Sequence, residues 1–286
     1  MTITEAQRQA RRGSVGSSDI AAILGIHPNM TAADVWASKV FEMEESGLSG
    51  DWIEAGNALE PAILDWAGRE IGKEIEKDPP TFLKPPHYHS NPDAMVIGEG
   101  AVLEAKTGQS EGWGEPGTDE IPPHILAQCQ WHLFVCEKQT CYVAAALASE
   151  YGIRMRLYVV ERDEEIMDGL RKRANSFWKE HVVPRARPGD VPPRLAMLKR
   201  IKKEPGSRVH VDPVLIDAWI QANKEKGGVE RHEKRCRAAL LEAMGTAEST
   251  HVDEWEITHM EQQRRPYQVA GGSYRVLRKK RRKEED

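Results

Sequence analysis

A glycine-centred hairpin pattern is the feature that most limits how this chain can fold. Two short alternating runs, residues 93–97 and 101–107, flank Gly98-Glu99-Gly100. Alternating runs joined by a short glycine-containing turn predict a β-hairpin. Glu104 and Lys106 lie two positions apart in the second run, so both side chains point to one face of the strand. The pattern therefore predicts an acidic and a basic side chain together on a sheet.

The position of Asp93 relative to this pair depends on the turn. A two-residue turn at Gly98-Glu99 would set Asp93 opposite Glu104, and one at Glu99-Gly100 would set it opposite Lys106. Both registers place Asp93 on the shared face, whereas a three-residue turn would send it to the other face. Directly opposed residues have Cβ atoms roughly 4.5–5.5 Å apart. The first two registers therefore bring two carboxylates and an ammonium to one point.

Such a cluster of charges needs compensation, which a divalent cation can supply. Mg²⁺ is the usual ion beside a phosphate substrate, and Mn²⁺ is expected to substitute for it. The candidate ligands are Asp93, Glu104 and the carbonyl of Ala105. Lys106 is the candidate catalytic residue, which could orient the attacking water or deprotonate it. The competing interpretation is a hairpin that carries a surface salt bridge.

The residues around the hairpin predict an α/β fold with a mixed sheet. Helices are expected where apolar residues recur at helical spacing, and strands where apolar runs are short. The expected helices are residues 17–25, 31–41, 56–71, 122–136 and the segment after Asp163, and the expected strands are residues 141–147 and 153–160. Mixed helices and strands in this order are typical of a single layered core.

A proline-rich segment at residues 184–193 predicts a domain boundary after Pro184. Residues 1–184 would form the core, and residues 185–286 would form a mostly helical extension. Gly227-Gly228 interrupts a charged helical pattern there and predicts a helical hairpin. A small β-element between residues 250 and 277 would follow. The basic run at residues 278–283 is either a solvated tail or a tail that holds DNA.

Composition limits the class of protein. The 286 residues are 40% hydrophobic and 30% charged, which fits a folded globular chain. No apolar run approaches the ~20 residues of a membrane helix, and the first residues lack the apolar stretch of a secretory signal. We therefore expect a cytoplasmic protein that does not enter a membrane. A net charge of −5 gives no support for nucleic-acid binding, so DNA binding would depend on local basic groups.

The four cysteines favour packing roles. The chain contains Cys129, Cys136, Cys141 and Cys236, and no two of them form a CxxC pair. Disulfide frameworks and metal clusters usually use closely spaced or regularly spaced cysteines. The cysteines therefore predict neither a disulfide framework nor an iron–sulfur cluster.

Seven short motifs follow one another between residues 11 and 182. They are Arg11 with Gly16-Ser17-Ser18-Asp19, GNALEP at 56–61, Asn91-Pro92-Asp93, LEAKT at 103–107, Trp113, Ile121-Pro122 with AQCQW at 127–131, and ERDEE at 161–165. In this order the motifs resemble the YqaJ-type viral recombinase family, the lambda-exonuclease-like group of PD-(D/E)xK nucleases. The resemblance implies a restriction-endonuclease-like core.

The resemblance also implies an activity and partners. The family's activity is Mg²⁺-dependent 5′→3′ hydrolysis of double-stranded DNA, which exposes 3′ single strands in phage-type recombination. The chain would then be encoded by a phage or prophage and act in the bacterial cytoplasm. Its partners would be double-stranded DNA ends and a single-strand annealing protein. It would form a homo-oligomer, with a trimer as one possibility.

Matched position by position, the resemblance assigns the metal site. Asp93 and Glu104 would bind the metal together with the Ala105 carbonyl, and Lys106 would be the catalytic lysine. Glu60, on the helix before the hairpin, would reach the metal or its water and join the catalytic group. From its position alone, Glu60 would be interpreted as a solvated helix acid.

The resemblance further assigns a pocket for the 5′-terminal phosphate to Arg11, Ser18 and Gln128, with Ser17 as the alternative to Ser18. The residues themselves agree, since a helix start offers free N–H groups to an anion and an arginine can clamp a phosphate. Plain helix capping is the alternative role of the serines. Trp113 lies in a glycine-rich loop, where it would either contact DNA or anchor the loop on the core.

Two other functions stay open at this point. One is a nuclease of the same fold that cuts internally or acts on single strands. The other is a non-catalytic DNA-binding scaffold for recombination. The retained acidic and basic residues argue against the scaffold, because an unused site has no reason to keep carboxylates crowded together.

Overall fold

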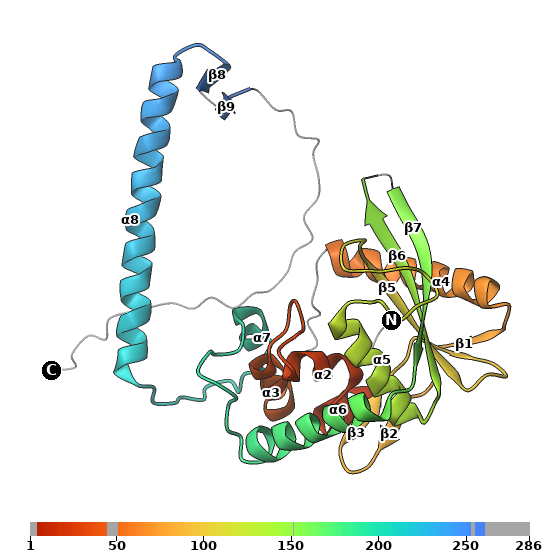
Figure 1. Cartoon of the computed structure of the whole chain (residues 1–286). Helices are drawn as coiled ribbons and strands as arrows, with labels where there is room; N and C mark the ends of the chain where they lie inside the picture. The colour runs from red at the N-terminus through yellow and green to blue at the C-terminus, as the bar shows by residue number, and fades with distance from the viewer. Residues whose placement is uncertain (1–4, 45–50, 151, 253–254, 261–286) are drawn as a thin grey trace. The chain divides into compact units, whose positions relative to one another are not determined.

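The computed structural model describes residues 5–44, 51–150, 152–252 and 255–260 (Figure 1). The chain divides into two compact units, residues 1–202 and residues 203–286. Each unit is described by itself below. Among the described helices, none combines the length and apolar character that crossing a membrane requires.

A five-stranded sheet forms the centre of the first unit, in the order β1-β4-β5-β6-β7. Its strands are β1 (Ile75–Lys77), β4 (Ala94–Val96), β5 (Ala101–Gln109), β6 (Thr140–Ser149) and β7 (Gly152–Glu161). Strands β5 and β6 run parallel, and the other pairs are antiparallel. A parallel pair needs a crossover connection, which α5 (Pro123–Cys136) provides. The predicted α/β fold with a mixed sheet is confirmed.

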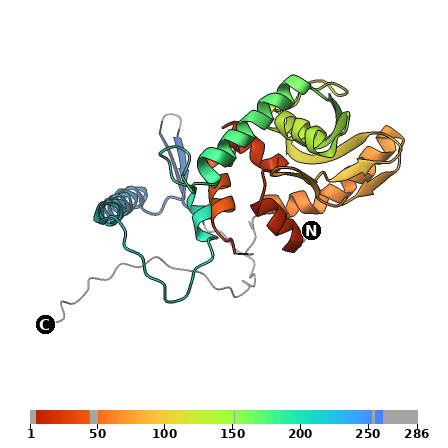
Figure 2. The ribbon, with the colours of Figure 1, turned by 90° about the horizontal axis from the view of Figure 1, so that it is seen from below.

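Two helices cover opposite faces of this sheet (Figures 1 and 2). Helix α4 (Asp51–Ile71) packs on one face through an apolar cluster that includes Ile63 and Leu103. Helix α5 packs on the other face through a cluster that includes Leu133 and Val102. Because side chains alternate along β5, Glu104 shares the α5 face with Val102. The two helices thus flank the strand that carries the predicted acid and lysine.

Further helical segments of the first unit are α1 (Glu5–Arg12), α2 (Ser17–Ile23), α3 (Ala32–Val40), α6 (Glu164–Phe177) and the π-helical turn η1 (Trp178–Val182). Buried side chains of α2, α3 and α6 form one apolar cluster with Trp131 of α5. The small sheet of β2 (Phe82–Lys84) and β3 (Tyr88–Ser90) joins this layer, and the Trp131 indole donates to the carbonyl of His89 at 3.0 Å.

The hairpin has the first of the two expected registers. Ala94 pairs with Leu103 and Val96 with Ala101. The next pair outward is therefore Asp93 with Glu104, as expected for a turn centred on Gly98-Glu99. Gly98 has a φ of +78°, a conformation that glycine adopts without steric cost.

The first unit extends beyond the boundary predicted after Pro184. Asp34, which is fully buried on α3, accepts hydrogen bonds from the Arg194 backbone N–H at 2.8 Å and from its Nε at 2.6 Å. Helix α7 (Leu195–Lys199) follows, and Met197 enters the apolar cluster around α5. These contacts hold the chain against α3 as far as Lys202.

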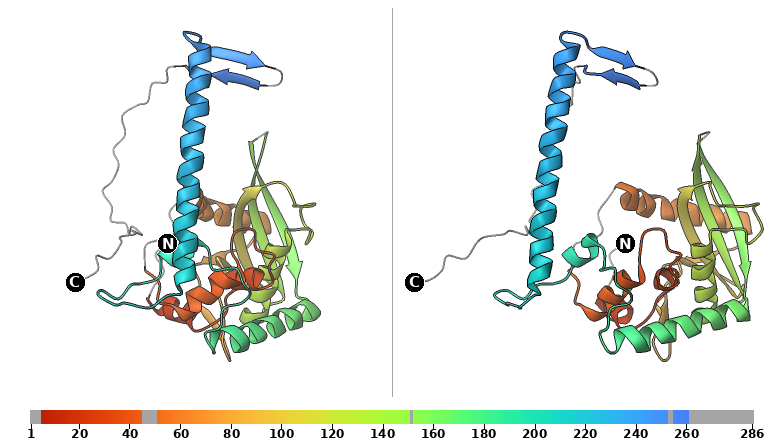
Figure 3. Two further views of the ribbon diagram at one scale, coloured as in Figure 1. Left: turned by 90° about the vertical axis from the view of Figure 1, so that its left-hand side faces the viewer. Right: turned by 60° about the vertical axis from the view of Figure 1, so that its left-hand side comes forward.

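The second unit contains one long helix, and the predicted helical hairpin is wrong. Helix α8 (Pro213–Met244) runs through Gly227-Gly228 without a break (Figure 3). Glycine weakens a helix by about 1 kcal/mol relative to alanine, but unlike proline it keeps its N–H donor. The ion pair Lys226–Glu230 spans the glycines, Glu233–Arg237 follows them, and both have the i,i+4 spacing that supports a continuous helix.

A short antiparallel pair, β8 (Ser249–Val252) and β9 (Trp255–Thr258), follows α8 and forms part of the predicted β-element. The rest of that element, and the basic run at residues 278–283, lie outside the described residues.

Candidate active site

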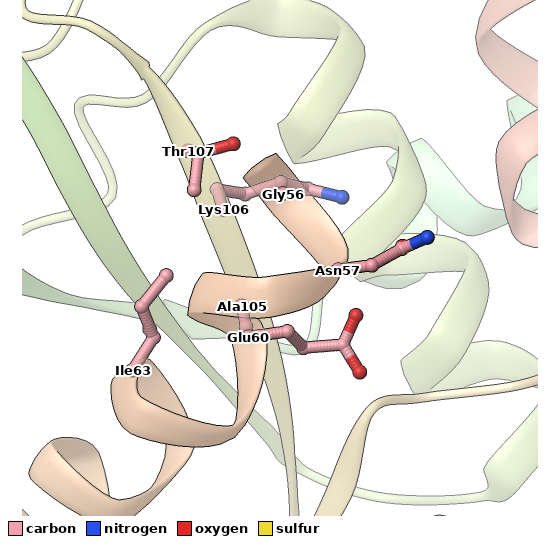
Figure 4. Close-up of a pocket in the computed structure, with 7 residues that line it drawn as sticks. All are labelled: Gly56, Asn57, Glu60, Ile63, Ala105, Lys106 and Thr107. Atoms are coloured by element: carbon pink, nitrogen blue, oxygen red, sulfur yellow. The ribbon is translucent and has the colours of Figure 1, made fainter. Parts of the chain in front are cut away.

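The candidate site lies where β5 continues past the end of β4. Pairing between the two strands stops at Ala94 and Leu103, while β5 runs on to Gln109. Helix α4 reaches this free edge from one face of the sheet and α5 reaches it from the other. A pocket of about 230 Å³ lies here, lined by Gly56, Asn57, Glu60, Ile63, Ala105, Lys106 and Thr107 (Figure 4).

Asp93 and Glu104 meet at this edge. The Asp93 carboxylate accepts a hydrogen bond from the Ala105 backbone N–H at 2.8 Å. This bond takes the place of the ladder bond that β4 would have made, because β4 has already ended. Glu104 is almost fully buried, with 3% of its surface exposed. Two carboxylates thus share one partly sealed corner of the sheet.

Lys106, Glu104 and Gln128 form a closed triangle of hydrogen bonds. Lys106 Nζ donates to Glu104 Oε1 at 2.5 Å and to Gln128 Oε1 at 3.0 Å. Gln128 Nε2 donates to the same Glu104 oxygen at 2.5 Å. The lysine and the acid come from β5 and the glutamine from α5, so the triangle ties the strand to the helix. It fixes both charged side chains relative to the pocket.

The crowding of charge shifts the pKa of each member. Burial and the charge of Glu104 raise the pKa of Asp93 well above its ordinary value. Burial also acts to raise the pKa of Glu104, but Lys106 and His132 outweigh it and lower the pKa to about 2. Burial acts to lower the pKa of Lys106, and the charges of Glu104 and Asp93 outweigh it and raise the pKa. At neutral pH the lysine and Glu104 are charged, while Asp93 resists ionisation.

Glu60 approaches the same point from α4. Its carboxylate and the side-chain amide of Asn57 extend to the same side of the pocket as the Lys106 amine (Figure 4). Burial and the nearby charges of Asp78 and Glu104 raise the pKa of Glu60. Because β4 ends early, this edge of β5 is open and Glu60 of α4 can approach the cluster. A β4 of full length would cover the edge.

The donor set fits a hard divalent cation. Glu104 Oε2 is buried and makes no regular hydrogen bond, although His132 Nε2 lies 3.1 Å from it. An unsatisfied carboxylate oxygen beside a carboxyl group of raised pKa is destabilising unless a cation compensates it. Among the described residues, no three His, Cys, Asp or Glu side chains converge on their own. An ion here would therefore need a backbone oxygen such as that of Ala105, as Mg²⁺ and Mn²⁺ sites commonly use carbonyl and water ligands.

A second group of the predicted residues lies at the junction of α1 and α2. Arg11 and Ser18 are exposed, whereas Ser17 is buried. The ammonium of Lys39, itself buried, donates to the Arg11 carbonyl and to Asp19 Oδ2, each at 2.6 Å. Lys39 therefore fixes the end of α1 against the start of α2. The sequence motifs gave no indication of this lysine.

Steric crowding explains why glycine occupies position 16, the first residue of the GSSD motif. A Cβ at Gly16 would collide with the ring of His89, which packs directly beneath it. Ser14 Oγ lies 2.8 Å from His89 Nδ1, and burial lowers the pKa of His89 to about 4. A neutral, buried imidazole thus supports the turn that presents Arg11 and Ser18.

Gln128 has surroundings that differ from those expected, whereas Trp113 packs as one of its two expected roles requires. Gln128 bonds to Glu104 and Lys106, so in this structure it belongs to the carboxylate cluster. Trp113 is half-buried, and its ring centroid lies 5.1 Å from that of Tyr158. These contacts give Gln128 and Trp113 roles in holding the core together. Their predicted roles toward DNA stay predictions.

Comparison with known proteins finds a family model that matches this region. Residues 8–139 match the YqaJ-like viral recombinase domain, and the match includes every candidate site residue from Arg11 to Gln128. The uncharacterized protein YqaJ of Bacillus subtilis (strain 168) is 29% identical over 178 residues, which are 60% of this chain. The match covers 54% of that protein, so this chain aligns with about half the length of its relative.

Solved structures of low identity resemble the chain in part. The alkaline exonuclease LHK-Exo of Laribacter hongkongensis, in its complex with dAMP, covers 64% of this chain and 94% of its own, with 18% identity and a TM-score of 0.49. A phage-related exonuclease from Haemophilus somnus 129PT covers 64% of this chain and 84% of its own, with 14% identity and a TM-score of 0.41.

The raised pKa of Asp93 predicts that this residue destabilises the metal-free protein at neutral pH. Its pKa is higher in the folded chain than in the unfolded chain, so folding stability falls as the pH rises through the interval between the two values. In the presence of a chelator, Asp93→Asn should raise the free energy of unfolding at pH 7–8 by about 1 kcal/mol or more. The gain should disappear in acid, where Asp93 is protonated in both states.

Urea unfolding of the wild type and the variant at several pH values measures this effect. Asp168→Asn, which alters an exposed ion pair with Arg171 on α6, is the matched control and should change stability by about 0.5 kcal/mol or less. A loss of stability in Asp93→Asn at neutral pH would contradict the electrostatic interpretation.

Proposed function

We propose that this chain, which carries a YqaJ-like viral recombinase domain, is a metal-dependent deoxyribonuclease that degrades double-stranded DNA from its 5′ ends. The observation that carries the proposal is the meeting of Asp93, Glu104 and Lys106 at the free edge of β5, beside an open pocket. Two acids and a lysine in this arrangement suit phosphodiester hydrolysis, and no purely structural role needs them together.

The metal would be held by the carboxylates of Asp93 and Glu104 and the Ala105 carbonyl, with Glu60 reaching it directly or through water. Mg²⁺, or Mn²⁺ in its place, supplies a Lewis acid that activates water and offsets negative charge at phosphorus. The buried and unsatisfied Glu104 Oε2 supports this assignment. Asp93 would give up its proton when the ion binds.

Lys106 acts as an ammonium in this proposal. Its raised pKa favours the charged form, so it orients the attacking water or contacts a phosphate oxygen and does not remove a proton. Gln128 and Glu104 hold its Nζ from two sides. The lysine is thereby fixed before DNA arrives, which reduces the reorganisation that the reaction requires.

The 5′-terminal phosphate would bind at the junction of α1 and α2. Arg11 and Ser18 are both exposed there and Lys39 fixes the backbone between them. We assign the contact to Ser18 because Ser17 is buried. The 5′→3′ direction, a single-strand annealing protein as partner and a homo-oligomer such as a trimer complete the proposal, and they rest on the family resemblance.

Replacing Lys106 tests the chemistry. Lys106→Ala should reduce Mg²⁺-dependent digestion of linear duplex DNA by roughly 10²-fold or more, because it removes a charged group from the reacting centre. Lys172→Ala, which alters an exposed lysine on α6, is the control and should digest DNA at the wild-type rate. Digestion by a folded Lys106→Ala variant at the wild-type rate would rule out the assigned role.

The phosphate pocket is tested by the chemistry of the DNA end. The wild type should digest 5′-phosphorylated duplex faster than 5′-hydroxyl duplex. In Arg11→Ala the ratio of these two rates should fall by roughly 10–100-fold. Arg12→Ala, the neighbouring arginine at the end of the same helix, should keep it. Rates of product release from end-labelled duplexes give both ratios.

If the wild type digests 5′-phosphorylated and 5′-hydroxyl duplexes at equal rates, the assignment of a pocket for the 5′-phosphate is wrong. A closed circular duplex in the same assay separates exonuclease from endonuclease activity. The proposal expects the circle to survive, and its nicking would favour an enzyme of the same fold that cuts internally.

A further inference from the structure

A buried chain of polar side chains lies behind Glu104, outside the pocket. His132 Nε2 is 3.1 Å from Glu104 Oε2, and His132 Nδ1 is 2.7 Å from Ser90 Oγ on β3. Cys136 Sγ donates to the same hydroxyl at 3.4 Å. His132 and Ser90 are fully buried. This row of side chains is almost sealed from solvent, so its polar groups depend on protein partners.

Helix α5 provides two successive contacts to the same carboxylate. Gln128 and His132 are four residues apart and therefore lie on one stripe of the helix, one turn above the other. Gln128 bonds to Oε1 of Glu104, and His132 lies against Oε2. Each oxygen of the acid thus has its own neighbour from α5. A rotation of the carboxylate would disturb both contacts together.

The contacts indicate which tautomer of His132 suits this arrangement. A nitrogen lone pair 3.1 Å from a carboxylate oxygen would repel it, so the tautomer that fits carries its proton on Nε2. In that tautomer Nδ1 accepts a hydrogen bond from the hydroxyl of Ser90. Ser90 in turn accepts from the thiol of Cys136. The hydrogen bonds thus run from Cys136 through Ser90 to His132, whose Nε2 lies against Glu104.

We propose that His132 is a positioning residue that holds the Glu104 carboxylate in the orientation in which it binds the divalent cation. This inference rests on the proposed function and extends it to a side chain outside the pocket. The contact of His132 with Oε2 lacks regular hydrogen-bond geometry, so that oxygen keeps a lone pair for the ion. A ligand that is already oriented loses less conformational freedom when the ion binds.

Gln130, two residues before His132 on α5, is a buried polar residue with a purely structural role. Gln130 is buried to the same degree, but its amide donates to the Glu161 carbonyl at 2.7 Å and accepts from the Asp163 N–H at 3.0 Å. It therefore ties α5 to the start of α6 and has no hydrogen bond to the acids. Gln130 is the matched control for His132.

The test measures Mn²⁺ affinity by calorimetry on the full chain without DNA. His132→Leu should weaken the affinity by roughly 10–100-fold, the usual effect of removing a residue that orients a ligand. His132→Gln, which keeps an N–H donor, should recover most of the loss, and Ser90→Ala should fall between. Gln130→Leu should lower the melting temperature but leave the Mn²⁺ affinity within about twofold.

The outcomes separate this inference from the proposed function. A wild type that binds no Mn²⁺ contradicts the proposed function itself. A wild type that binds, with unchanged affinity in folded His132→Leu, overturns only the inference. If His132→Leu does not fold, unchanged affinity in both His132→Gln and Ser90→Ala overturns it. An equal loss in Gln130→Leu also overturns it, because the effect would then be general.

Discussion

The repulsion between two carboxylates at one strand edge is the constraint on which the rest of this structure depends. Asp93 and Glu104 face each other where β4 ends, and burial together with the charge of Glu104 raises the pKa of Asp93. A soluble scaffold could avoid this cost with a single uncharged residue. In the proposed function a divalent cation offsets this cost, because its positive charge relieves the repulsion between the two carboxylates.

The surrounding elements keep this unfavourable corner in place from three sides. The Ala105 N–H holds Asp93, and Gln128 and Lys106 hold one oxygen of Glu104. Helix α4 contributes Glu60 through an edge that a longer β4 would have covered. The short β4 leaves one edge of β5 open, so side chains from helices on both faces of the sheet reach that edge.

Local spacing predicted the centre of this arrangement but not its supports. The two-residue interval of Glu104 and Lys106 sets their common face, and the glycine turn sets Asp93 opposite the acid. The contacts of Lys39 with α1 and of His132 with Glu104 join residues far apart in the sequence, so no local sequence pattern predicts them. The continuity of α8 was missed because two glycines weaken a helix without removing a donor.

Anomalous diffraction from crystals soaked in Mn²⁺ is the most direct measurement of whether this corner is a metal site. We expect one strong peak roughly 2.0–2.6 Å from carboxylate oxygens of Asp93 and Glu104 and from the Ala105 carbonyl. The peak should vanish in Glu104→Gln crystals grown in the same way. A fully ordered site without a peak, or a peak held by other residues, would contradict the assignment of this pair as metal ligands.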